Sequence, residues 1–211
     1  MNYDLICIDI MKKVSTEGKK KRLLLQACCA PCSSAVLERL ATTFDITMLF
    51  YNPNITEEKE YRKRKEELQR FLHKKYPNIK ILDCSYDKEA FLEVTRGLEQ
   101  EKEGGKRCYQ CYLLRLQKTA SLAQMHHFDY FGTTLSISPY KNSAWLNEIG
   151  KDLEEKYQIS YLYADFKKHN GYQRSIELSK EYGLYRQDYC GCIYSKIERE
   201  KKKELEFQRE N

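Results

Sequence analysis

The chain has 211 residues, a net charge of +6 and 41% hydrophobic residues, which is enough for a core. The length suits one domain, so we expect residues 1–211 to form a single α/β domain with its core at about 20–195. No apolar run approaches the ~20 residues of a membrane-spanning helix, and the first residues lack the apolar stretch of a signal peptide. The composition therefore argues against a membrane protein and predicts a cytoplasmic one.

Strands and helices are predicted to alternate along the chain. Short apolar runs between turn residues indicate strands at 22–28, 45–51, 79–84, 128–134 and 160–165. Helices are predicted at 4–15, 30–42, 57–75, 88–97, 108–127, 143–157 and 172–182, with a charged C-terminal helix after residue 192. Thr56 and Asp87 are the expected N-caps of the third and fourth helices. The alternation predicts an α/β fold: a Rossmann-like, parallel, five-stranded sheet with helices on both faces, plus a short N-terminal helix.

Polar loops follow three of the predicted strands, at 28–32, 52–54 and 133–141. Ligands of parallel sheets bind beyond the carboxyl ends of the strands, near the point where the strand order reverses. If the first and fourth strands are neighbours, all three loops face one crevice.

Seven of the nine cysteines lie in three tight clusters, at 28–32, 108–111 and 190–192. In a reducing compartment such clusters indicate metal binding or catalysis, because structural disulfides are rare there. Seven thiolates exceed the four that one tetrahedral metal or one cubane cluster needs. The surplus indicates two neighbouring centres, or a cluster beside a dithiol, and favours electron transfer over a structural zinc.

Four cysteines are predicted to bind a [4Fe-4S] cluster: Cys28, Cys29, Cys108 and Cys111. Two adjacent cysteines suit two different irons of a cubane better than one mononuclear ion. The second pair stands at i and i+3 near a helix start, which places both sulfurs on one face where the helix N-terminus stabilises thiolates.

The remaining clustered cysteines form a candidate second centre. Cys190 and Cys192 flank one glycine and either close a reducible disulfide or chelate a second metal, iron or zinc. Cys32 lies one helical turn from the first pair and is predicted to complete that second site. A zinc knuckle built from any two of the pairs is the structural alternative.

The chain has basic tracts at 19–22, 62–65 and 201–203, and it contains seventeen tyrosines. Aromatic and basic side chains together suit stacking on unpaired bases and contact with phosphates, although a solvated lysine-rich surface has the same composition. No phosphate-binding loop or dinucleotide fingerprint is found.

Several motifs, in order along the chain, resemble those of the cobalamin-independent epoxyqueuosine reductase family, often called QueH. They are Cys-Cys-Ala-Pro-Cys-Ser at 28–33, Tyr-Asn-Pro-Asn at 51–54, Glu60-Tyr61-x-x-Arg64, Arg107-Cys108-x-x-Cys111-Tyr112, and the segments 133–141 and 185–195. Each motif alone is weak, but jointly they are specific and span nearly the whole chain.

The resemblance implies reduction of epoxyqueuosine to queuosine at the wobble position of tRNA, the last step of queuosine biosynthesis. It implies an iron–sulfur cluster, an adjacent redox centre and a fold similar to adenine-nucleotide hydrolase-like domains. The implied partners are the tRNA anticodon loop and a low-potential electron donor such as a ferredoxin or flavodoxin.

The resemblance also implies roles for particular residues. Catalytic roles fall to Cys190, Cys192 and Cys32. Residues expected to hold the flipped base or its phosphates are Asn52, Asn54, Arg64, Arg107, Tyr140, Lys141, Arg186 and Gln187. The proton donor is expected among Tyr140, Lys141, Asp188 and Tyr189.

Two other functions compete with this interpretation. A cluster-dependent tRNA sulfurtransferase predicts a nucleotide-binding loop after the first strand, where this chain has paired cysteines and Pro31. A non-catalytic, zinc-stabilised RNA-binding module predicts a colourless protein with no need for surplus thiols.

Overall fold

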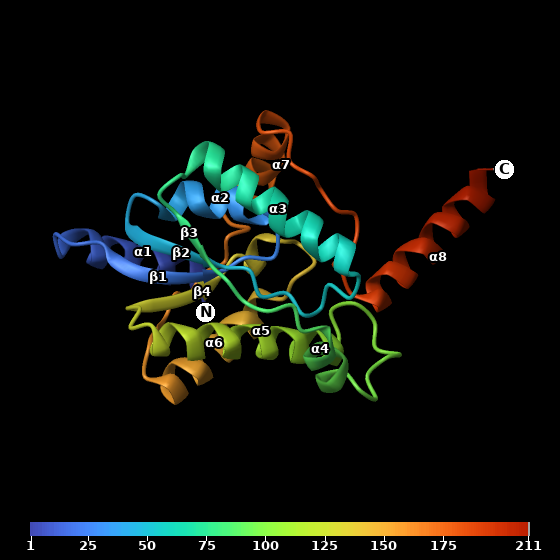
Figure 1. Cartoon of the computed structure of the whole chain (residues 1–211), viewed down its shortest axis with the longest axis horizontal. Helices are drawn as coiled ribbons and strands as arrows, with labels where there is room; N and C mark the ends of the chain where they lie inside the picture. Colours follow the sequence, from blue (N-terminus) through green and yellow to red (C-terminus); the bar gives the residue numbers. More distant parts are fainter. Residues whose placement is uncertain (211) are drawn as a thin grey trace.

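A computed structural model describes residues 1–210, with side chains through residue 208 (Figure 1). The strands are β1 (Lys21–Gln26), β2 (Phe44–Leu49), β3 (Lys80–Leu82), β4 (Tyr130–Thr133) and β5 (Ser160–Tyr161). The α-helices are α1 (Tyr3–Thr16), α2 (Ala30–Leu40), α3 (Glu58–Lys75), α4 (Lys88–Val94), α5 (Lys106–Met125), α6 (Ser143–Tyr157), α7 (Gly171–Glu181) and α8 (Ile193–Glu210). A short 3-10 helix, η1 (Leu135–Ile137), follows β4.

The strands form one sheet in the order β3-β2-β1-β4-β5, and every neighbouring pair is parallel, as predicted. The apolar run of β1 suits its central place, because a central strand is covered on both faces. Leu23 stands beside Ile46 of β2 and Tyr130 of β4. The strand order reverses between β1 and β4, so the loops that follow these strands meet at one edge.

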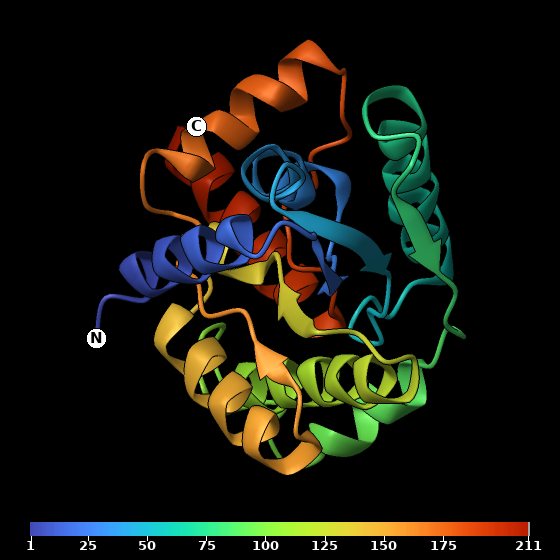
Figure 2. The same cartoon turned by 90° about the vertical axis from the view of Figure 1, so that its left-hand side faces the viewer.

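Helices cover both faces of the sheet, which confirms the predicted α/β fold (Figure 2). α2, α3 and α7 lie on one face, where Leu23 and Leu25 of β1 join their core. α5 and α6 lie on the other face, where Leu24 joins Phe131 of β4. Successive side chains of β1 therefore contribute to two separate cores, as the two-residue period of a strand requires.

The turn from β1 into α2 brings the first cysteine cluster to the edge of the sheet. Cys29 is the N-cap of α2, and its Sγ accepts a hydrogen bond from the backbone N–H of Cys32 at 3.4 Å. Pro31 lies in the first turn of α2, where its missing N–H removes no helical hydrogen bond.

Two local predictions differ from the structure. Asp87 caps α4 as predicted, but α3 begins at Glu58 with Glu57 as its N-cap, so Thr56 is not a cap. The backbone N–H of Thr56 instead donates to the carbonyl of Gly191 at 3.2 Å, which ties this segment to the third cysteine cluster. The strand predicted at 160–165 is limited to Ser160–Tyr161, and the backbone of Ala164 bonds to the Asn147 side chain.

The N-terminal and C-terminal helices are both present, on opposite sides of the view in Figure 1. α8 projects away from the sheet and its covering helices, and most of its side chains beyond residue 199 are exposed. Within the described residues, no helix combines the length and apolar character needed to cross a membrane.

Candidate active site

A cavity of about 1380 Å³ opens at the carboxyl edge of the sheet. Its walls come from the loops that follow β1 and β4, from the segments 99–103 and 186–190, and from the start of α8. Cys28, Cys32 and Cys190 line it, so two cysteine clusters distant in the sequence reach the same space. A cavity of this size accommodates a nucleoside-sized ligand.

Cys28, Cys29 and Cys32 form a first thiol group, in which the three Sγ atoms lie within 4.8 Å of one another. Burial would raise the pKa of Cys29, but hydrogen bonds from the other two thiols and from Gln187 hold it well below its ordinary value. Gln187 Nε2 donates to the Cys29 sulfur at 3.0 Å. Within this thiol group ionisation is favoured at Cys29, whereas hydrogen bonds and burial raise the pKa of Cys28 and Cys32, and a thiolate is the form that binds metals. Cys32 thus lies beside the first pair, whereas the sequence pattern grouped it with Cys190 and Cys192.

The other four clustered cysteines form a second thiol group at the start of α5. Cys111 packs with Cys192 in a small buried cluster, and Cys190 and Cys108 lie close enough to contribute to the raised pKa of Cys111. Burial is the main cause that raises the pKa of Cys111 to about 12. Burial also raises the pKa of Cys108, although the N–H of Gly104 donates to its sulfur at 3.3 Å. Burial thus outweighs the expected stabilisation of these thiolates by the helix N-terminus.

All nine cysteines of the chain are free in this structure, so the disulfide considered for Cys190 and Cys192 is not formed. Gly191 separates them with a φ of +116°, a backbone conformation that favours glycine. The buried Arg64 fixes the preceding backbone by donating to the carbonyls of Cys190 at 3.0 Å and Tyr189 at 3.3 Å. This loop is therefore held from the side of α3.

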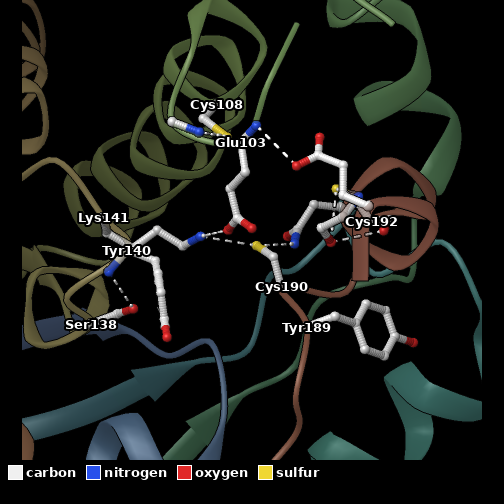
Figure 3. A network of polar contacts seen from close by, with 12 residues as sticks. Glu103, Cys108, Ser138, Tyr140, Lys141, Tyr189, Cys190 and Cys192 are labelled. Atoms are coloured by element: carbon white, nitrogen blue, oxygen red, sulfur yellow. Dashed lines mark hydrogen bonds and ion pairs between the residues drawn. The ribbon is translucent and has the colours of Figure 1, made fainter. Parts of the chain in front are cut away.

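Lys141 points at the Cys190 sulfur from the loop after η1 (Figure 3). Its Nζ lies 3.2 Å from that sulfur and donates to Glu103 Oε1 at 2.8 Å. Burial alone would lower the pKa of Lys141, but electrostatic interactions with Cys190, Tyr112 and Glu103 and the hydrogen bond to Glu103 hold it well above its ordinary value. The side chain is therefore a buried ammonium group beside a thiol.

Five of the eight predicted substrate-binding residues line the cavity. They are Arg64, Tyr140, Lys141, Arg186 and Gln187. Tyr140 is 72% exposed, so its ring is available for stacking on a base.

The other three are buried and bonded within the protein. Asn52 donates to the carbonyl of Ala27 at 2.8 Å, and Asn54 Nδ2 lies 4.0 Å from the Cys190 sulfur. Arg107 donates to Glu198 at 3.1 Å and so links α5 to α8. Their contacts favour a supporting role for these three side chains.

Asp188 and Tyr189 are also expected proton donors, but their environments differ from that of Lys141. The Asp188 carboxylate accepts from Lys203 at 2.6 Å, and this hydrogen bond holds its pKa below the ordinary value. Asp188 is therefore ionised near neutral pH and has no proton to give. Burial raises the pKa of Tyr189, so the phenol keeps its proton.

Two residues of the site were missed by sequence reasoning, Arg115 and Glu103. Arg115 is 1% exposed and lies on α5, four residues after Cys111 and seven after Cys108, so the three share one helix face. That spacing was a usable signal. Glu103 reaches Lys141 only through the fold, and nothing in its local sequence marks it.

Four buried polar atoms in the described residues lack a hydrogen-bond partner, and all four surround the thiols. They are Asn54 Oδ1, Tyr112 OH, Arg115 Nε and Gln187 Oε1. Unpaired buried polar atoms are rare and usually mark a missing ligand, ion or water. Together with seven soft sulfur donors, they fit a thiolate-bound metal or cluster and a polar substrate in this cavity.

A model of the family described as "Epoxyqueuosine reductase QueH" matches residues 23–198 of the chain. The chain belongs to the QueH family of epoxyqueuosine reductases. The residues matched to the QueH model include all seven clustered cysteines, whereas α1 and the distal part of α8 lie outside the match.

Curated QueH proteins match nearly the whole chain. The epoxyqueuosine reductase QueH of Streptococcus pyogenes serotype M1 is 42% identical over 92% of this chain and 78% of its own length. The QueH of Staphylococcus epidermidis is 38% identical over 92% of this chain and 84% of its own length. The QueH of Thermotoga maritima is 36% identical over 85% of this chain and 93% of its own length. The QueH family is one of oxidoreductases, in agreement with the resemblance seen in the sequence.

Proposed function

We propose that this protein reduces epoxyqueuosine to queuosine at the wobble position of tRNA, the last step of queuosine biosynthesis. Membership of the QueH family supports the reaction. The observation that carries the proposal for this chain is the cavity, in which two thiol groups and a buried ammonium group meet. A site for reductive removal of an oxygen atom needs both an electron source and a proton source, and this cavity offers candidates for both.

The reaction removes the epoxide oxygen as water. Both carbon–oxygen bonds break, a carbon–carbon double bond forms, and two electrons and two protons are consumed for each oxygen removed. Both electrons must come from an external reductant, because the protein returns to its starting state after each turnover. We propose a low-potential donor of the ferredoxin or flavodoxin type.

We propose that Cys28, Cys29, Cys108 and Cys111 hold a [4Fe-4S] cluster. Such a cluster supplies single electrons at low potential when it is bound. Arg115 supports this ligand set, because it lines the cavity together with Cys28 and lies one helical turn after Cys111 on α5. The two pairs therefore border one common region, which is the requirement for a shared cluster.

Cys190 and Cys192 are proposed as the adjacent redox or metal centre, with Cys32 at its edge. Cys32 and Cys190 both line the cavity. A second metal there would act as a Lewis acid toward the epoxide oxygen, whereas a dithiol would supply two electrons by closing a disulfide.

Lys141 is the side chain best placed to deliver a proton to the leaving oxygen. It lines the cavity, it is charged, and Glu103 orients its Nζ toward Cys190. A positioned general acid stabilises the developing negative charge on the oxygen as the carbon–oxygen bond breaks.

The mouth of the cavity suits the tRNA anticodon loop. Tyr140 is available for base stacking, and Arg186 and Gln187 line the same cavity. Lys201 and Lys202 of α8 line the outer rim, where phosphates of the stem would lie. Salt should weaken tRNA binding through counterion release, and an affinity that is indifferent to salt would argue against these lysines as contacts.

The proposal is tested by anaerobic incubation of the reconstituted protein with epoxyqueuosine tRNA and a low-potential reductant, followed by mass analysis of the nucleosides. We expect a loss of one oxygen from the modified nucleoside, and Cys84→Ser, at an isolated thiol outside the three clusters, serves as the matched control. An intact cluster without conversion would reject the proposal. Sulfur incorporation into the tRNA on addition of ATP would favour a sulfurtransferase instead.

A further inference from the structure

Arg115 is a buried cation, and the usual partner of such a cation is a carboxylate. Its side chain is 1% exposed, and no ion pair between it and a carboxylate is found within residues 1–208. Its Nη2 donates a hydrogen bond to Asn52 Oδ1, at 2.6 Å. Burying an ionised guanidinium is costly unless a nearby anion compensates.

The Asn52 contact fixes the guanidinium but does not neutralise it. Asn52 is itself held by its Nδ2, which donates to Ala27, and by Gln26, which donates to the same Oδ1 at 3.2 Å. The Arg115 Nε remains buried with no hydrogen-bond partner among the described residues. The guanidinium is therefore fixed by Asn52, and its Nε–H donor is unused.

Arg115 lines the cavity together with Cys28 and Cys190. Burial would lower its pKa, but Cys111, Cys28 and Cys190 act on it and hold the pKa above its ordinary value. These thiols come from three separate segments of the chain, so the guanidinium lies among all three cysteine clusters. A helix face shared with Cys108 and Cys111 brings it there.

We propose that Arg115 is a positioning residue whose fixed positive charge offsets the negative charge of the cysteine-bound cluster and makes the cluster easier to reduce. The inference rests on the proposed function, because it needs the cluster. Reduction adds one electron from an external one-electron donor to the cluster, and the negative charge rises by one while Arg115 keeps its proton. A fixed cation favours the more negative state, so its removal shifts the reduction potential downward.

The experiment compares the reconstituted full-length protein with Arg115→Met and Arg115→Lys. Bound iron is measured, and the midpoint potential of the cluster is read from an anaerobic dithionite titration followed by electron paramagnetic resonance. Arg115→Met is expected to lower the midpoint potential, and Arg115→Lys, which keeps the charge, to stay close to the parent protein.

Arg22→Met is the matched control. Arg22 is a cation stacked on the Phe128 ring, with its guanidinium bonded to the carbonyls of His126 and His127, at the opposite end of β1. It lies outside the proposed machinery, so its loss should leave the potential and the iron content unchanged.

Two further results distinguish the possible failures. An iron-loaded Arg115→Met with the parent potential, or an Arg115→Lys potential as low as that of Arg115→Met, overturns the inference alone. If Arg115→Met binds no iron, restored iron in Arg115→Lys supports the role of charge, and loss in both variants overturns it. A parent protein that binds no iron overturns the proposed cofactor together with this inference.

Discussion

The Nζ of Lys141 lies 3.2 Å from the Sγ of Cys190, although 49 residues separate them in the chain (Figure 3). Glu103 holds the ammonium from its other side at 2.8 Å. A buried ammonium between a thiol and a carboxylate is preorganised, so it needs no rearrangement before it acts on a bound oxygen.

Lys141→Met is expected to lower turnover by about 10²-fold or more, the usual effect of losing a positioned general acid, without loss of iron. Lys141→Arg should retain part of the activity because it keeps the charge. The measurement is the rate of epoxyqueuosine conversion at saturating tRNA. Lys168→Met, at an exposed lysine, is the control, and wild-type turnover in Lys141→Met would refute the role of this lysine.

Serine substitutions should distinguish the proposed cluster ligands from the adjacent redox or metal centre. Cys108→Ser is expected to lose cluster iron and colour, because a hydroxyl is a poor replacement for a thiolate ligand. Cys190→Ser should abolish turnover and keep most of the iron. Iron analysis and visible absorption check both results, with Cys84→Ser as control. Full retention of iron in Cys108→Ser, or its loss in Cys190→Ser, would contradict the proposed ligand set.

Charge reversal on α8 should weaken tRNA binding. Lys201→Glu with Lys202→Glu removes two cations from the rim of the cavity, so the slope of log affinity against log salt should fall by about one for each phosphate that the protein no longer neutralises. Binding titrations at several salt concentrations measure this. The paired change Lys12→Glu and Lys13→Glu, on exposed residues of α1, is the control. If the two double variants weaken tRNA binding equally, the loss comes from the change in net charge and is not specific to α8.

Gly191→Ala should disturb the loop that carries Cys190 and Cys192. A Cβ there would lie 2.9 Å from Ile55 Cγ1 and 3.2 Å from Arg64 Nη1, at a positive φ that costs about 1–3 kcal/mol. We expect lower unfolding free energy and lower turnover. Gly18→Ala, at a positive φ in open space, controls for backbone strain, and its activity should be normal. Normal turnover in Gly191→Ala would show that the loop tolerates the shift.

Asp4 should make the stability of the protein depend on pH. Burial would raise its pKa, but hydrogen bonds from Arg39 and His169, each at 2.8 Å, hold the pKa below the ordinary 3.8. Because the folded-state pKa is depressed, the contribution is complete above the unfolded-state pKa and is lost as the pH falls through the folded-state pKa.

Asp4→Asn is therefore expected to lower the unfolding free energy by about 1–3 kcal/mol at neutral pH and by progressively less in acid. Denaturant unfolding at a series of pH values measures the difference. Asp9→Asn, at an exposed residue 4.0 Å from Lys12, should have little effect at any pH. If the difference in unfolding free energy between Asp4→Asn and the parent stays constant as the pH falls into the acid range, this linkage is excluded.

The sequence by itself determined the features that depend on local spacing. The alternation of apolar runs and charged helices predicted the parallel sheet and both helix layers, because strand and helix periods are short-range properties. The three cysteine clusters and the motifs around them identified the family before any contact was known.

Only the tertiary structure decided which distant groups meet. The pairing of β1 with β4 closes the crevice, and the sequence left that order open. Gln187 donates to Cys29, which lies 158 residues away in the chain. Glu103, just before α5, likewise accepts from Lys141, which follows η1. Arg115 stood on a recognisable helix face, but its lack of a carboxylate partner among residues 1–208 was visible only once the surrounding side chains were placed. Contacts of this kind are set by strand order and packing, and no local periodicity encodes them.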